Sequence, residues 1–160
     1  MIRRLLLVSA FLLPTVSLSA QNAGPLSTLP DLVGPLKATP GCLGVETAQT
    51  SSGKLVIFAW FEDRGALLRW YSSDLHQQLM KLGPSSGRPP LADIADGTGP
   101  ILAIASLTPR TMPGGSTIPF AQMAIELYQP LPGGAFVNGR FAPPGVKVSG
   151  MRGVTLDTGK

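Results

Sequence analysis

The chain has 160 residues, a formal net charge of +4, 44% hydrophobic residues and a single cysteine. This length fits one domain built around one hydrophobic core. A single cysteine excludes a disulfide within the chain, and charges this few and scattered do not form a nucleic-acid-binding surface. The 19 glycines and 16 prolines predict long loops between the elements.

Residues 1–20 have the pattern of a secretory signal peptide. Arg3 and Arg4 precede an almost wholly apolar run at residues 5–13, and small residues follow up to Ala20. The run is too short to span a bilayer as a helix. We therefore predict cleavage near Ala20, a secreted or periplasmic protein, and no membrane association after the signal is removed. Without the two arginines the net charge falls to about +2, so we expect no nucleic-acid partner.

Residues 21–142 are predicted to form one domain, which begins with a short broken segment and a hairpin. The segment 30–36 suits a short helix or two turns, because Pro35 prevents a long continuation. Residues 43–49 alternate apolar and polar side chains, as a strand does, and Ser51-Ser52-Gly53 turns the chain back into a second strand at residues 55–61. Cys42 is expected to be a small buried residue rather than a reactive thiol, because no basic neighbour in sequence would lower its pKa.

The second strand and the segment after it carry the densest apolar pattern of the mature chain. Residues 55–61 are apolar on both faces, which predicts a strand covered on both sides. Asp63 is a suitable N-cap, and leucines at steps of three and four residues predict one long helix over residues 64–82. Gly83 and Pro84 then end the helix.

The remaining chain is expected to supply strands and loops but no further long helix. Residues 83–99 and 109–119 are loops, residues 101–107 and 120–128 are strands, and residues 135–141 suit a short strand. Residues 143–160 contain few core side chains and are predicted to be a flexible tail. Together these elements predict an α+β fold, an antiparallel sheet with one long helix packed on one face.

Three runs of sequence resemble the antibiotic-biosynthesis-monooxygenase domains. They are Pro40-Gly41-Cys42-Leu43-Gly44-Val45-Glu46, Phe58-Ala59-Trp60-Phe61-Glu62 and Ala66-Leu67-Leu68-Arg69-Trp70-Tyr71-Ser72-Ser73-Asp74-Leu75-His76. In that family a turn of the first kind leads into a strand, a second strand follows, and then comes a helix that carries a small residue and a histidine near an aromatic one. The resemblance covers residues 32–82 and implies a ferredoxin-like sandwich that pairs into a dimeric α/β barrel.

The chain also departs from that pattern. Family members begin with a strand and a full helix before the first run, and here only a short, proline-broken segment precedes it. Two explanations remain open at this point. Either the later strands complete the sheet, or the chain is a shortened relative.

The resemblance directs attention to one histidine and its aromatic neighbours. In haem-degrading relatives a helix histidine ligates the haem iron, and His76 is the only residue here that could do so. The alternative is a structural or exposed histidine that is hydrogen-bonded nearby. The candidate pocket or ligand-binding residues are His76, Trp70, Trp60, Phe58 and Tyr71. No catalytic residue is assigned and no metal site is expected, because a lone histidine cannot build one.

Three functions are compatible with these observations. The first is a secreted dimeric-barrel domain that binds an apolar or aromatic small molecule, with or without a cofactor-independent monooxygenase activity. The second is a haem-binding or haem-degrading protein that uses His76. The third is a non-catalytic interaction protein. We also predict a homodimer joined through a sheet face, since residues 55–61 are apolar on both faces and a single helix covers only one.

Overall fold

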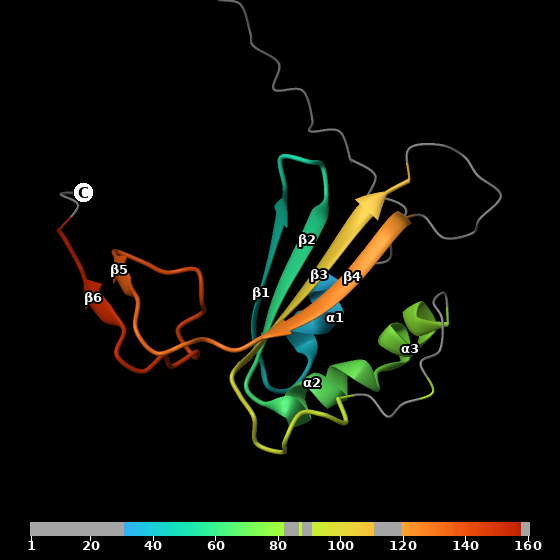
Figure 1. The fold of residues 1–160 in the computed structure, drawn as a ribbon, viewed down its shortest axis with the longest axis horizontal. Coiled ribbons are helices and arrows are strands. Elements are labelled where there is room, and N and C mark those ends of the chain that lie inside the picture. The colour runs from blue at the N-terminus through green and yellow to red at the C-terminus, as the bar shows by residue number, and fades with distance from the viewer. Residues whose placement is uncertain (1–30, 82–86, 88–90, 111–119, 158–160) are drawn as a thin grey trace, which may run out of the picture.

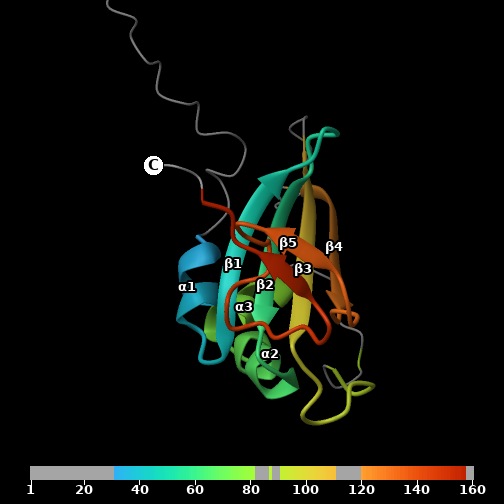
Figure 2. The same ribbon diagram turned by 90° about the vertical axis from the view of Figure 1, so that its left-hand side faces the viewer.

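The computed structural model describes residues 31–81, 87, 91–110 and 120–157. Its centre is a four-stranded antiparallel sheet. Three helices lie on one face of this sheet and a C-terminal segment lies on the other (Figures 1 and 2). This arrangement fits the α+β, ferredoxin-like class that the sequence predicts.

The sheet contains all four of the strands expected from the apolar patterns. They are β1 (Cys42–Gln49), β2 (Leu55–Phe61), β3 (Ile101–Pro109) and β4 (Phe120–Tyr128), and they lie in the order β1-β2-β3-β4. The later strands therefore complete the sheet, which decides between the two explanations left open above. The hairpin between β1 and β2 is also confirmed, and Gly53 at its turn has a φ of +81°, which favours glycine.

The helix layer differs from the sequence-based prediction. The single long helix expected over residues 64–82 is wrong, because the chain forms two helices, α2 (Arg64–Tyr71) and α3 (Asp74–Met80). Asp63 caps α2 as expected, since its Oδ1 accepts from Ala66 N at 2.7 Å. Ser73 begins a second helix, because its backbone is extended and its Oγ accepts from His76 N at 3.3 Å.

The short segment before the hairpin forms α1 (Val33–Ala38). Pro35 is its third residue, and proline is tolerated there because the first N–H groups of a helix have no partner within it. Cys42 begins β1 and packs beside the core, where it is half-buried and thus less buried than the sequence analysis predicted. Desolvation by burial raises the pKa of its thiol, so the group favours the unreactive protonated form.

The chain returns from α3 to the start of α2 before it enters β3. Arg64 N donates to the Thr98 carbonyl at 2.8 Å, and the Arg64 guanidinium pairs with Asp96 at 2.6 Å. A Cβ at Gly99 would overlap the Glu62 carbonyl oxygen, so glycine permits this close approach. As a result, Ile101 pairs with Phe61 and β3 runs antiparallel beside β2.

The main core lies between the helices and the sheet. Its buried residues are Leu36, Val45, Ile57, Ala59, Phe61, Ala66, Leu67, Trp70 and Ile101. Burial of each large apolar side chain contributes about 1.5–3 kcal/mol, so this layer dominates the stability of the domain.

The other face of the sheet is covered in part by residues 130–157, which we call the C-terminal unit (Figure 2). It contains two short parallel strands, β5 (Ala135–Val137) and β6 (Arg152–Val154). Phe141 lies edge-on to Phe58, with ring centroids 5.0 Å apart, and Val146 is fully buried. Val146 is thus a core residue that the sequence analysis missed, whereas the flexibility expected of residues 143–160 stays a prediction.

In the part of the chain that the structure describes, no helix combines the length and apolar character needed to cross a membrane.

Candidate ligand-binding cavity

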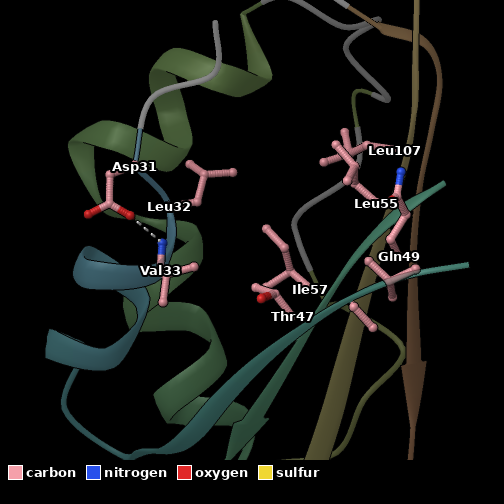
Figure 3. A pocket seen from close by; sticks show the side chains of 10 residues that line it. Asp31, Leu32, Val33, Thr47, Gln49, Leu55, Ile57 and Leu107 are labelled. Carbon is pink, nitrogen blue, oxygen red and sulfur yellow. Dashed lines mark hydrogen bonds between the residues drawn. The ribbon is translucent and has the colours of Figure 1, made fainter. Parts of the chain in front are cut away.

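A cavity of about 500 Å³ lies between the start of α1 and the end of the sheet where β1 turns into β2 (Figure 3). Its described lining residues come from four segments, two of which are the arms of the β1–β2 hairpin. They are Asp31, Leu32, Val33, Thr47, Ala48, Gln49, Leu55, Val56, Ile57 and Leu107. The volume is within the range of small-molecule sites, which are concave and mostly apolar.

The sheet forms the floor of the cavity. The register places Thr47 opposite Ile57 and Gln49 opposite Leu55, and Leu55 in turn lies opposite Leu107. Directly opposite residues share a face of the sheet, so these side chains lie together on the helix side. The floor is therefore built by β1, β2 and β3 in adjacent rows.

The apolar floor continues beyond the cavity onto the edge strand. Leu107 lies opposite Met123, and Ala105 lies opposite Ile125. Met123 is 42% exposed and Ile125 is 50% exposed. The cavity is thus the covered part of a longer apolar surface on the helix side of the sheet.

The opposite wall comes from the chain that enters α1. Figure 3 shows Asp31, Leu32 and Val33 across the cavity from the strand residues. Asp31 Oδ1 accepts from Val33 N at 3.0 Å and from Gly34 N at 3.3 Å, which fixes the first turn of the helix. Its carboxylate is the one ionisable group among the described lining residues.

His76, Trp70 and Tyr71 lie together, but at the junction of α2 and α3 and not in the described lining of the cavity. The His76 ring lies 4.7 Å from the Tyr71 ring and 5.6 Å from the Trp70 ring, between centroids. His76 Nδ1 is 2.9 Å from the Tyr71 carbonyl oxygen, which also accepts from Gln77 Nε2 at 2.6 Å. These bonds satisfy a carbonyl at the end of α2, so the geometry is that of a structural histidine.

The environment of His76 favours its neutral form. The residue is only 7% exposed, and desolvation by burial lowers the pKa of the imidazole. The hydrogen bond with the Tyr71 carbonyl acts in the opposite direction and is the smaller effect. A neutral ring that donates from Nδ1 keeps an acceptor lone pair on Nε2. In this structure the ring packs against two aromatic side chains.

Trp60 and Phe58 lie on the other face of the sheet, under the C-terminal unit. Trp60 is 6% exposed, and its Nε1 is buried without a hydrogen-bond partner in the described part of the chain. Phe58 contacts Phe141. The structure therefore places the five sequence-based candidates at two separate locations, and the cavity lining is a third.

The sequence contained only part of the information needed to find this cavity. The alternation in residues 43–49 and 55–61 indicated which side chains share a face of the sheet. By contrast, nothing in the pattern of residues 31–33 indicates that they lie across from that face. Among the described residues, no cluster of histidine, cysteine and carboxylate side chains could hold a metal ion.

The model of the antibiotic biosynthesis monooxygenase family matches residues 25–82. This result confirms the resemblance that the sequence analysis identified. The matched segment contains α1, β1, β2, α2 and α3, and most of the cavity lining, whereas β3, β4 and the C-terminal unit lie outside it. No curated protein and no solved structure matches the chain.

Proposed function

We propose that the protein binds an apolar small molecule in the cavity between α1 and the sheet. The supporting observation is a 500 Å³ space with a mainly aliphatic lining, most of which belongs to the segment that matches a small-molecule monooxygenase family. Apolar contacts would supply most of the binding free energy, at about 25 cal/mol per Å² of apolar surface removed from water. The few polar groups at its boundary would orient the ligand.

A cavity-filling variant tests this proposal. The Thr47 side chain lies on the cavity side of β1, whereas its neighbour Glu46 points to the other face, and both residues are exposed. We expect Thr47→Trp to weaken the binding of 1-dodecanol, measured by calorimetry, by about tenfold or more, since a filled cavity loses at least two buried methylene contacts. Glu46→Trp is the matched control and should bind as the wild type does. Equal binding by both variants would place the ligand elsewhere.

Oxygenation of the bound molecule is the second candidate function. The family match favours it. In a cofactor-independent reaction an electron-rich substrate itself reduces oxygen, and the protein contributes a dry cavity that holds the substrate in its reactive form. This activity would be supported if the wild type consumes oxygen in the presence of a bound ligand and the Thr47→Trp variant does not.

Haem binding through His76 is the alternative that the structure favours least. The ring is buried between Trp70 and Tyr71, and its Nδ1 is already bonded. We expect little or no Soret shift when haem is added to the protein. A clear shift that is lost in His76→Ala, but retained in a variant such as Thr47→Trp, would contradict this expectation and make the protein a haem binder.

Export and dimerisation complete the proposal. The pattern of residues 1–20, which lie outside the described residues, supports a secreted or periplasmic protein whose mature chain begins between residues 19 and 22. The homodimer through a sheet face was predicted because β2 is apolar on both faces. The C-terminal unit covers part of this face, including Phe58 and Gly44, so a second copy would meet the uncovered part or displace the unit.

A further inference from the structure

We propose that the cavity selects a ligand with an extended aliphatic body and a neutral or positively charged polar head. This inference rests on the proposed function and specifies its ligand. It disfavours the aromatic molecules that the sequence left open, and among them phenolates and haem, which carry negative charge. Three properties of the cavity support it.

The first property is the chemistry of the lining. Its apolar side chains are aliphatic, and no aromatic ring is present among the described lining residues. Aromatic ligands gain specific stabilisation from stacked or edge-to-face rings, and this lining offers none. The aromatic residues that the sequence suggested for this purpose lie on the other face of the sheet or at the α2–α3 junction. Aliphatic groups can still fill the space through non-directional contacts.

The second property is the direction in which the apolar surface extends. The row Gln49, Leu55, Leu107, Met123 crosses all four strands, and its last three residues are apolar. Neighbouring strands are about 4.8 Å apart, so the apolar part from Leu55 to Met123 is roughly 10 Å long. Its outer end is exposed at Met123. A compact ring system would occupy only the covered part, whereas an extended chain would also bury the exposed end.

The third property is the charge at the wall. Asp31 provides the only formal charge among the described lining residues, and it is negative. A ligand carboxylate, phosphate or phenolate near this wall would be repelled, and an ammonium group would be attracted. Asp31 is exposed, so solvent screens the interaction and its contribution is small, about threefold in affinity. The charge therefore adjusts the choice of head group, and the aliphatic lining determines the body.

Four probes separate these contributions, each titrated calorimetrically with the mature protein at a concentration below its micelle formation or its solubility limit. They are dodecylammonium, 1-dodecanol, dodecanoate and 2-naphthol. We expect dodecylammonium to bind about threefold more tightly than dodecanol, and dodecanoate about threefold more weakly. The affinity of 2-naphthol should be about tenfold below that of dodecanol, because it leaves the outer end of the apolar row uncovered.

Asp31→Asn tests the role of the charge. The asparagine Oδ1 can still accept from the first N–H groups of α1, so the helix start is retained. In this variant the ammonium, alcohol and carboxylate probes should bind with similar affinity. An unchanged preference among the three head groups would overturn the assignment of Asp31.

The outcomes also distinguish this inference from the function on which it rests. If 2-naphthol binds as tightly as dodecanol, and Thr47→Trp abolishes both, the ligand class proposed here is wrong while the cavity remains the binding site. If no probe binds, or Thr47→Trp and Glu46→Trp have the same effect, both proposals fail. Both proposals are supported if the aliphatic probes bind tightly, Thr47→Trp weakens their binding, and 2-naphthol binds weakly.

Discussion

His76 illustrates how burial decides the role of a titratable side chain. In a single long helix it would lie at the boundary of the apolar face. The break before α3 instead directs the ring back to the Tyr71 carbonyl and between two aromatic rings. The resulting desolvation lowers the pKa of the imidazole below its ordinary value of 6.5. The residue therefore resists protonation and contributes to the fold as a neutral hydrogen-bonding group.

This shift predicts a loss of stability in mild acid. Below about pH 6.5 the unfolded chain takes up a proton on His76 that the folded chain does not, so the free energy of unfolding falls as the pH decreases. The contribution is complete above the ordinary pKa and is lost as the pH falls through the lowered one. Urea unfolding at pH 7.5 and 5.5 should show this decrease in the wild type.

The variant His76→Asn is the control for that prediction. An asparagine Nδ2 can donate to the Tyr71 carbonyl in place of Nδ1, but it does not titrate. The difference in unfolding free energy between the two pH values should therefore be smaller in the variant. An identical difference in both proteins would mean that His76 is not the group responsible.

At the scale of elements, the break between α2 and α3 falls at two adjacent serines. Ser72 closes α2, since its backbone N–H donates to the Leu68 carbonyl. Ser73 is extended, with φ −67° and ψ 148°, and its side chain caps the next helix. The leucine spacing continues across the break, which explains why the pattern alone predicted one helix. Local side-chain bonding thus prevailed over periodicity.

Replacing the capping serine should destabilise the protein, and replacing its neighbour should not. We expect Ser73→Ala to lower the free energy of unfolding by about 0.5–2 kcal/mol, because the His76 N–H loses its acceptor. Ser72→Ala is the matched control, since it alters the same junction but leaves the cap in place. Chemical denaturation measures both changes. Equal effects would indicate that the Ser73 cap does not stabilise α3.

At the scale of the whole molecule, the C-terminal unit provides the second cover of the sheet. The Arg140 guanidinium holds its turn together by donating to the carbonyls of Pro143, Pro144 and Val146, the last at 2.6 Å. Contact with the sheet is apolar at Phe141 and Pro143, the latter packed against Gly44. A face that would otherwise expose large aromatic side chains is thereby covered within one chain.

Detaching this unit should expose the sheet face and promote self-association. Val146 is fully buried, so Val146→Asp would place an unpaired charge inside the contact, at a cost of about 3 kcal/mol. We expect the variant to show a red-shifted tryptophan emission as Trp60 meets water, and a higher average mass by light scattering. Val137→Asp is the matched control, because Val137 is 59% exposed and belongs to the same unit.

The same measurement examines the predicted homodimer. If the wild type is already a dimer and Val146→Asp does not change its mass, the second copy does not compete with the C-terminal unit. If the wild type is a monomer and only the Val146→Asp variant dimerises, the dimer forms through the sheet face that the C-terminal unit covers in the wild type.

The sequence by itself determined the elements whose causes are local. Apolar patterning located all four strands of the main sheet, by alternation or by continuous apolar runs, with the bounds of β2 and β4 as observed. The Asp63 cap and the turn before Leu55 were also apparent, because a cap or a turn depends on residues within a few positions of one another. The resemblance over residues 32–82, which the family match confirms, rests on the same continuous segment.

Only the tertiary structure determined which distant segments of the chain face one another. It placed Leu32 and Val33 over the sheet to close the cavity, and it moved His76, Trp60 and Phe58 away from that cavity. It also paired β3 with β2 and buried Val146 in the C-terminal unit. These contacts join residues many positions apart, so they depend on how the whole chain packs its apolar surfaces, and no short stretch of sequence specifies them.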